Sequence, residues 1–287
     1  MQLKEIKNIF HKELGSLYPP EEVNSFFYLL IEHYLGMERF VLALQPNLTV
    51  SKDEEQPLFE ALSQLRLGRP IQYVIGQADF MDLEFLVNDK VLIPRPETEE
   101  LVRWILDDVN DGRGKGGVGE LKILDIGTGS GCIAVALAKN LPKAEVHALD
   151  VSGLALEVAR KNAVRNAVDI QFLEVDILKG PELPDAFDVI VSNPPYVREK
   201  EKAEMHANVL DNEPDMALFV SDGDPLLFYR AIARFSKGGL KKEGRLYLEI
   251  NQYLGKETQE LLKEHNFSEI ELRKDMFEND RMIRACF

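Results

Sequence analysis

The loop Asn193-Pro194-Pro195-Tyr196 combines groups that suit chemistry at a planar nitrogen. An amide or exocyclic amine nitrogen is a poor nucleophile, and two hydrogen-bond acceptors aimed at its N–H groups orient it and favour charge as it develops. The Asn193 side-chain oxygen and the Pro194 carbonyl oxygen are two such acceptors. Both prolines restrict φ and stiffen the loop, and Tyr196 can stack on a planar group. Such residues are also common in surface turns, so the loop is informative because it follows the apolar strand run 188–191.

A second segment, residues 127–131, has glycine at every second position between a predicted strand and a predicted helix. Glycines let the backbone approach a ligand closely, and a helix N-terminus supplies free N–H groups. Asp150 ends the next strand, where a carboxylate can accept hydrogen bonds from both ribose hydroxyls. Asp176 ends the third strand, where a side chain can reach an adenine edge. The dinucleotide pattern has its third glycine where this chain has Cys132, so the spacing favours S-adenosylmethionine.

The elements that position these two loops follow from apolar periodicity. Within residues 1–75, apolar residues recur at helical spacing, which predicts a helical N-terminal domain. Within 76–95 the period changes to two around Asn88-Asp89, which predicts a β-hairpin linker with its turn at that pair. The remainder, 96–287, forms the third predicted domain, and from residue 121 its strands and helices alternate. That alternation predicts an α/β fold with a mostly parallel sheet and helices on both faces.

Several segments of the third domain are assigned individually. The predicted strands are 122–126, 145–149, 170–174, 189–192, 245–250, 270–273 and 282–287. The predicted helices are 132–140, 154–166, 226–235 and 254–265. We interpret residues 111–119 as a flexible surface loop, and residues 198–204 as a solvated helix face.

Composition restricts the class of protein. The chain has 287 residues with 45% hydrophobic and 29% charged residues, which is ordinary for a globular protein with a sizeable core. Its formal net charge of −15 disfavours stable binding to nucleic acid, which needs a basic surface. No apolar run is long enough to span a membrane, and Cys132 and Cys286 are widely separated, so we expect a cytoplasmic protein with reduced thiols. The five histidines show no ligand spacing, and no metal is predicted.

Taken together, these motifs resemble the protein-(glutamine-N5) methyltransferases of the HemK/PrmC type, which modify peptide-chain release factors. The resemblance covers nearly the whole chain. The matching residues are Arg69-Pro70, Tyr73, Gly76, 93–99, 124–131, Asp150, Ser152, 188–197, Glu213-Pro214, Ala217-Leu218 and Asp222-Gly223. The segment Ile-Pro-Arg-Pro-Glu-Thr-Glu at 93–99 together with Asn-Pro-Pro-Tyr is more specific than either alone.

This resemblance implies a Rossmann-like, seven-stranded S-adenosylmethionine-dependent methyltransferase domain preceded by a small helical bundle and a hairpin linker. The implied reaction is N5-methylation of the glutamine amide in the Gly-Gly-Gln motif of class I release factors, with S-adenosylhomocysteine as product. The helical domain is then expected to recognise the protein substrate. The implied catalytic residues are Asn193, Pro194, Pro195 and Tyr196. The implied cofactor-binding residues are Gly127, Thr128, Gly129, Ser130, Gly131, Asp150, Asp176, Ile177 and Asn193.

The chain departs from the family pattern at three places, one of which is Phe219-Val220-Ser221, where a glycine-rich stretch is usual before Asp222-Gly223. Ile177 stands where some relatives carry an aromatic residue, and an aliphatic side chain covers adenine with less stacking. Asn251 stands where a glycine is usual. Arg95 and Glu97 have two interpretations of equal weight, since they either shape the substrate entrance or form a structural salt bridge or helix cap.

Three other functions compete with release factor methylation. An adenine-N6 methyltransferase also uses Asn-Pro-Pro-Tyr, because a flipped adenine presents the same planar amine, but the net charge and the segment 93–99 disfavour it. A non-enzymatic binding module would have no need of the glycines, the acids and the Asn-Pro-Pro-Tyr loop together. A dehydrogenase is disfavoured by the glycine spacing. We expect a monomer.

Overall fold

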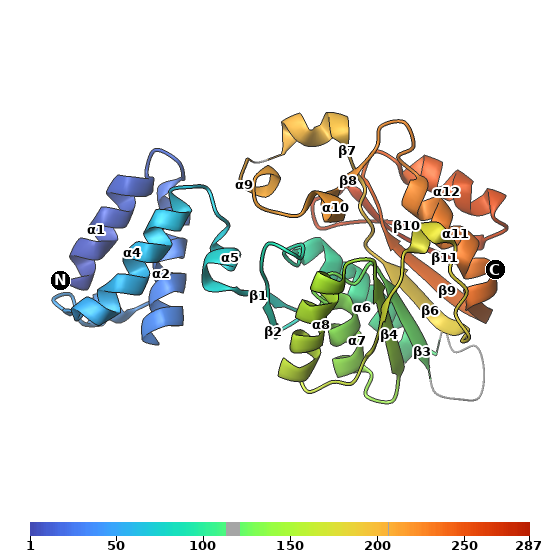
Figure 1. The fold of residues 1–287 in the computed structure, drawn as a ribbon, viewed down its shortest axis with the longest axis horizontal. Coiled ribbons are helices and arrows are strands. Elements are labelled where there is room, and N and C mark those ends of the chain that lie inside the picture. Colours follow the sequence, from blue (N-terminus) through green and yellow to red (C-terminus); the bar gives the residue numbers. More distant parts are fainter. Residues whose placement is uncertain (113–120, 206) are drawn as a thin grey trace. The chain divides into compact units, whose positions relative to one another are not determined.

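The computed structural model describes residues 1–112, 121–205 and 207–287. The chain forms two compact units, of which the first comprises Met1–Gly76 with His206–Asn212 and the second comprises Gln77–Met205 with Glu213–Phe287 (Figure 1). The residues predicted as a surface loop, 111–119, lie mostly outside the described residues. Among the helices described, none is long and apolar enough to cross a membrane.

The first unit is a bundle of helices around its own apolar core. Its helices are α1 (Leu3–Leu14), α2 (Pro20–Leu35), α3 (Val41–Leu44), α4 (Lys52–Leu65), α5 (Ile71–Ile75) and α9 (Ala207–Leu210). The side chains at its centre come from the apolar faces of α1, α2 and α4, and include Phe10, Phe27 and Leu58, which are fully buried. Helices α1, α2, α3 and α4 agree with the helical periodicity of the sequence, whereas α5 and α9 were not predicted from it.

The second unit contains a seven-stranded sheet in the order β10-β11-β9-β6-β3-β4-β5. Its strands are β3 (Lys122–Ile126), β4 (Glu145–Asp150), β5 (Gln171–Glu174), β6 (Phe187–Ser192), β9 (Leu240–Glu249), β10 (Ser268–Lys274) and β11 (Asp280–Cys286). The strands from β5 to β9 are parallel neighbours, whereas β11 runs antiparallel to both β9 and β10. The predicted α/β fold with a mostly parallel sheet is confirmed.

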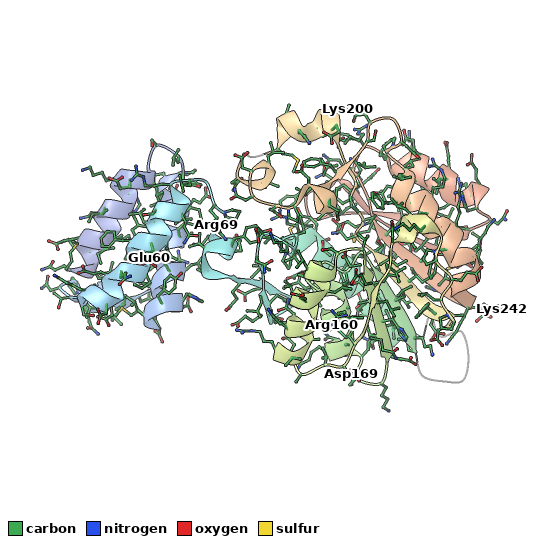
Figure 2. All side chains as sticks on the ribbon, in the orientation of Figure 1. Glu60, Arg69, Arg160, Asp169, Lys200 and Lys242 are labelled. Carbon is green, nitrogen blue, oxygen red and sulfur yellow. The ribbon has the colours of Figure 1, made fainter. Side chains whose placement is uncertain are left out.

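Helices cover both faces of this sheet because its strands are apolar on both sides. On β6, Val189 and Val191 face a core shared with α6, α7 and α8, whereas Ile190 faces a second core shared with α11 and α12. These helices are α6 (Pro96–Asn110), α7 (Cys132–Asn140), α8 (Gly153–Arg165), α11 (Leu227–Gly239) and α12 (Gly255–Glu264). Charged side chains such as Arg160 and Lys242 project from the outside of this unit and are exposed (Figure 2).

Short elements complete the second unit around the sheet. They are β1 (Gln77–Phe80), β2 (Leu83–Leu86), η1 (Ile177–Lys179), β7 (Val197–Arg198), η2 (Glu199–Glu204), α10 (Asp215–Leu218) and β8 (Phe219–Val220). Strands β7 and β8 pair in parallel. The segment 198–204 is thus a short strand end and a 3₁₀ helix, and our interpretation of it as a solvated helix face was wrong at Glu201. The Glu201 carboxylate is buried, and it accepts hydrogen bonds from Arg198 and Asn251.

The predicted hairpin exists, but its turn lies elsewhere. Strands β1 and β2 pair across Met81-Asp82, and both of these residues have positive φ, as a two-residue hairpin turn of the I′ type requires. Asn88 does form a local turn, because its side chain accepts a hydrogen bond from the backbone of Lys90. That turn follows the hairpin and joins no pair of strands.

A buried asparagine fixes this hairpin to the rest of the unit. The Asn162 side chain on α8 accepts a hydrogen bond from the Leu86 backbone N–H at 2.7 Å and donates to the Leu86 carbonyl at 3.0 Å. It also donates to the Ser130 carbonyl in the glycine-rich segment at 2.8 Å. One side chain therefore holds the hairpin, α8 and the glycine-rich segment in a single arrangement.

Replacing Asn162 with alanine should lower the free energy of unfolding by about 2–4 kcal/mol, because it leaves buried backbone groups of Leu86 and Ser130 without partners. Chemical denaturation of the purified variant measures this change. The matched control is Asn140→Ala, which removes an exposed side chain at the end of α7 and should change stability by less than about 0.5 kcal/mol. Equal effects of the two substitutions would contradict the linking role of Asn162.

Candidate active site

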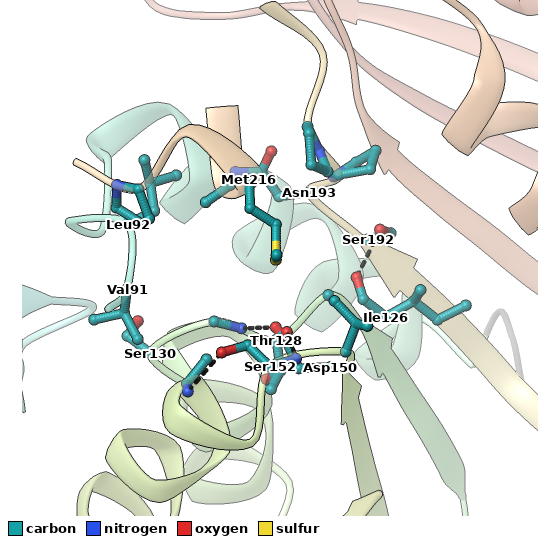
Figure 3. A pocket seen from close by; sticks show the side chains of 18 of the residues that line it. Val91, Leu92, Ile126, Thr128, Ser130, Asp150, Ser152, Ser192, Asn193 and Met216 are labelled. Carbon is teal, nitrogen blue, oxygen red and sulfur yellow. Dashed lines mark hydrogen bonds between the residues drawn. The ribbon is translucent and has the colours of Figure 1, made fainter. Parts of the chain in front are cut away.

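A cavity of about 400 Å³ lies at the carboxyl ends of β3, β4 and β6. Figure 3 shows Met216 and Asn193 on one wall, and Thr128, Asp150 and Ser152 on the opposite wall. The sequence-predicted residues that line the cavity are Gly127, Thr128, Gly129, Ser130, Asp150, Asp176, Ile177, Asn193, Pro194 and Pro195. Gly131 and Tyr196 were also predicted for the site, but neither is among the lining residues.

The glycine-rich loop is tied to the end of β4 by backbone hydrogen bonds. Gly127 and Thr128 both donate to the Leu149 carbonyl, at 2.8 and 3.0 Å. Gly127 and Gly129 have φ of +74° and +54°, and a Cβ built on either would meet no atom within 4 Å. A side chain there would therefore be strained and would occupy free space beside the cavity wall. The loop leaves room for a ligand to approach the backbone closely.

Gly131 serves the packing of helices instead of lining the cavity. Its φ is +82°, and a Cβ at this position would lie 3.0 Å from the Cβ of Ala159 on α8. The absence of a side chain lets α7 begin directly against α8. This packing explains why a glycine is needed at a position that does not line the cavity.

Asp150 closes the glycine loop from the end of β4. Its two carboxylate oxygens accept hydrogen bonds from the Gly129 and Ser152 backbone N–H groups, each at 2.9 Å. Burial raises the pKa of Asp150, and the backbone donors act in the opposite direction. Each oxygen retains further acceptor capacity toward the cavity. Asp176 also lines the cavity, but one of its oxygens caps η1 by accepting from the Leu178 N–H at 2.9 Å.

The Asn-Pro-Pro-Tyr loop begins where β6 ends. The Ser192 hydroxyl is buried and donates to the Ile126 carbonyl at 2.7 Å, so the ends of β6 and β3 are held together. The next residue, Asn193, therefore reaches the cavity from the strand beside the glycine loop. Its side-chain Nδ2 donates to the Thr98 hydroxyl on α6 at 3.1 Å.

Tyr196 points away from the cavity, toward a buried carboxylate. Its hydroxyl donates to Glu249 Oε1 at 3.0 Å, and Arg281 Nη1 donates to the same hydroxyl at 3.3 Å. Its backbone carbonyl accepts from Asn251 Nδ2 at 2.9 Å. Burial, followed by the charge of Glu249, raises the pKa of Tyr196 well above its ordinary value. Asn251, the residue that stands in place of a family glycine, thus holds the backbone of this loop.

Sequence reasoning missed several residues of the cavity. Met216 on α10 and the hairpin exit residues Val91 and Leu92 line it, although no spacing in the sequence connects them to the strand ends. Arg95 lines it too and forms an ion pair with the buried Glu213. The ion pair agrees with the interpretation of Arg95 as part of a structural salt bridge, whereas a role in shaping the substrate entrance stays a prediction. The presence of Glu-Pro at 213–214 among the family motifs was the available signal for this ion pair.

One group of potential metal ligands lies outside this cavity. Ligand atoms of Glu145, His147 and Asp185 come within 4.8 Å of one another. The Lys122 ammonium group lies 3.2 Å from Glu145 and 2.7 Å from Asp185, so it already offsets part of the charge of these two carboxylates. We assign no metal to this group.

A fully buried carboxylate, Asp125, lies beneath the glycine loop. Its Oδ2 accepts from the Thr128 hydroxyl at 2.6 Å, whereas its Oδ1 has no hydrogen-bond partner among the described residues. Burial raises its pKa to about 7, and the charge of Asp150 acts in the same direction. A proton on Asp125 is therefore held more tightly by the folded protein than by the unfolded chain.

The stability that this proton contributes should be fully present below about pH 4 and lost as the pH rises through 7. Between about pH 5.5 and 8, the free energy of unfolding should fall by on the order of 2 kcal/mol relative to Asp125→Asn, whose amide does not titrate. Chemical denaturation of both proteins at several pH values measures this difference. A difference that is constant across the range would contradict the raised pKa.

Comparison with known proteins agrees with this geometry. Residues 11–76 match the family described as the PrmC N-terminal domain, and residues 117–224 match the family described as the methyltransferase small domain. In solved structures, the methyltransferase from Pyrococcus furiosus is similar with a TM-score of 0.51 and 18% identity, over 82% of this chain and 98% of that chain. This likeness concerns the fold alone.

Curated relatives resemble the chain over its full length. The release factor glutamine methyltransferase of Flavobacterium psychrophilum is 50% identical over 287 residues, which is all of both chains. The release factor glutamine methyltransferase of Bacteroides thetaiotaomicron is 40% identical over 99% of both chains. This chain therefore belongs to the family of release factor glutamine methyltransferases.

Proposed function

We propose that this protein transfers the methyl group of S-adenosylmethionine to the side-chain nitrogen of the glutamine in the Gly-Gly-Gln motif of class I release factors. One observation carries the proposal: the Asn193-Pro194 acceptors share a single cavity with the glycine loop and Asp150. An amide nitrogen and a nucleotide-borne methyl group can therefore meet in that cavity. The 50% identity to a relative named for this activity supports the same substrate.

The cofactor side of the cavity fits S-adenosylmethionine. The space beside Gly127 and Gly129, which a Cβ would occupy, accommodates close approach of the ligand to the backbone. Asp150 and Ile177 both line the cavity. In this proposal, Asp150 accepts hydrogen bonds from the ribose hydroxyls and Ile177 covers adenine. When bound, the cofactor supplies an electrophilic methyl group on a sulfonium. The chain's own residues then have only to bind and orient it.

On the substrate side, Asn193 Oδ1 and the Pro194 carbonyl oxygen accept hydrogen bonds from the two N–H groups of the glutamine amide. These contacts orient the nitrogen and stabilise the positive charge that develops on it. The product cation loses a proton readily, so this arrangement needs no strong base at the moment of transfer. Tyr196 contributes by holding the loop, because its hydroxyl and its carbonyl are both hydrogen-bonded behind the cavity.

The partners follow from the same proposal. The helical domain, residues 1–75, recognises the protein substrate, and the hairpin linker, 76–95, joins it to the methyltransferase domain, 96–287. The protein works as a monomer in the cytoplasm. A net charge of −15 supports a protein partner over nucleic acid, since a polyanion is repelled on average.

Replacing Gly129 with alanine should weaken S-adenosylmethionine binding by about tenfold or more, because the new methyl group occupies the space of the ligand. Isothermal titration calorimetry measures the dissociation constant. The matched control is Gly180→Ala, which carries the same kind of backbone strain at φ +64° but lies away from the cavity lining. If both variants bind the cofactor as wild type does, the glycine loop is not the cofactor site.

Labelled S-adenosylmethionine should methylate an unmodified release factor, but not the factor whose loop glutamine is replaced by alanine. Asn193→Ala should lower kcat/KM on the order of a hundredfold, because it removes one of the two acceptors for the amide. Asn140→Ala, on the exposed end of α7, should behave as wild type. Unmethylated DNA is offered in parallel, and label on DNA with none on either protein would contradict the proposed function.

A further inference from the structure

A chain of hydrogen bonds runs from Asn193 into the protein, away from the cavity. Asn193 Nδ2 donates to Thr98 Oγ1 at 3.1 Å, and the Thr98 hydroxyl donates to Glu249 Oε2 at 2.6 Å. The other carboxylate oxygen, Glu249 Oε1, accepts from the Tyr196 hydroxyl at 3.0 Å. Thr98 and Glu249 are both buried; Thr98 lines the cavity, whereas Glu249 does not.

The direction of these bonds follows from counting donors and acceptors. An ionised carboxylate only accepts, so the single hydroxyl hydrogen of Thr98 is directed to Glu249. Thr98 Oγ1 then presents only lone pairs to its other neighbour. Asn193 must therefore turn its NH₂ group toward Thr98, whichever way its amide is drawn. Its Oδ1 has no donor among the described residues and is left for a ligand in the cavity.

Three groups around Glu249 stabilise its ionised form. Burial raises the pKa of Glu249 above its ordinary value, and the charge of Glu97 adds to the rise, whereas the hydroxyls of Thr98 and Tyr196 and the positive charge of Arg281 act to lower it. The Arg281 guanidinium is held in place by Asp275, which accepts from Arg281 Nε at 2.9 Å. A buried carboxylate with two hydroxyl donors and a nearby guanidinium retains its charge more easily than an isolated one.

We propose that Thr98 and Glu249 are positioning residues that fix the side-chain amide of Asn193 with its oxygen toward the substrate, and thereby select an amide over a carboxylate. The proposal rests on the proposed function. A glutamine amide offers two N–H groups to Asn193 Oδ1 and the Pro194 carbonyl, whereas a glutamate carboxylate would meet two acceptors and no donor. If the Asn193 amide were free to flip, its NH₂ group would instead attract a carboxylate.

The first test removes the Thr98 hydroxyl. Thr98→Val keeps the shape of the side chain but no longer accepts from Asn193, and kcat for release factor methylation should fall by about tenfold or more. Thr98→Ser keeps the hydroxyl and should stay within about threefold of wild type. The dissociation constant for S-adenosylmethionine should be unchanged in both. The matched control is Thr258→Val, which removes another buried hydroxyl, on α12, and should leave kcat unchanged.

The second test reads selectivity, which a merely structural role would not alter. A release factor with its loop glutamine changed to glutamate is offered as a competitor, beside the factor with alanine there. With the wild-type enzyme, the glutamate factor should inhibit methylation of the intact release factor less strongly than the alanine factor does. With the Thr98→Val enzyme, the glutamate factor should inhibit this methylation more strongly than the alanine factor does. The proposal would be overturned if the two factors inhibited Thr98→Val in the same order as wild type. It would also be overturned if Thr98→Ser lost as much kcat as Thr98→Val.

A third measurement separates this proposal from the proposed function. In a ¹⁵N–¹H spectrum, the side-chain amide signal of Asn193 is identified by its loss in Asn193→Ala. That signal should shift in Thr98→Val and stay near its wild-type position in Thr98→Ser and Thr258→Val. If the chemical shift of this signal is the same in Thr98→Val as in wild type, the proposed fixed orientation of the Asn193 amide is overturned. Wild-type protein that fails to methylate the intact factor overturns the proposed function, while the spectrum still decides the orientation.

Discussion

The parallel pairing of β3 with β4 and β6 is the constraint on which the site depends. Its register aligns Ile126 with Leu149 on one side and with Ser192 on the other. The residues that follow these three positions must therefore emerge together at one edge of the sheet. They are the glycine loop, Asp150 and Asn193, which lie far apart in the sequence. No side-chain contact between them is needed to bring them together, because the backbone ladders already do so.

Polar groups are buried behind these aligned strand ends. The free-energy cost of burying them has to be offset by neighbouring groups. Asp125 and Glu249 are both carboxylates with raised pKa values, and both lie at this edge. The two differ in their partners. Glu249 has two hydroxyl donors and the charge of Arg281, whereas Asp125 has one hydroxyl and an unpaired oxygen. More groups therefore stabilise the charge of Glu249 than that of Asp125, and Asp125 is suited to hold a proton near neutral pH.

The sequence predicted the parts of the fold that depend on local pattern. The strands of the seven-stranded sheet, the helices α7, α8, α11 and α12, and the cavity-lining glycines follow from periodicity and from turn chemistry, whereas the short elements β7, β8, η1 and α10 were not predicted. The hairpin turn was misplaced because Asn88-Asp89 has stronger turn propensity than Met81-Asp82, and only pairing of β1 with β2 decides between them. The buried position of Glu201 could not be predicted for a similar reason, since it depends on Asn251, fifty residues away.

The contacts of Thr98 with Asn193 and Glu249 show the same limit more sharply. Thr98 belongs to a motif that the sequence singled out, but its partners lie 95 and 151 residues further along the chain. A sequence motif identifies functional residues but does not show which atoms their side chains contact. The first turn of α6 supplies the hydroxyl, the end of β9 supplies the carboxylate, and the end of β6 supplies the amide. Only the sheet order, which sets β6 between β3 and β9, makes these three meet. The same order that assembles the cavity therefore also determines which end of the Asn193 amide faces it.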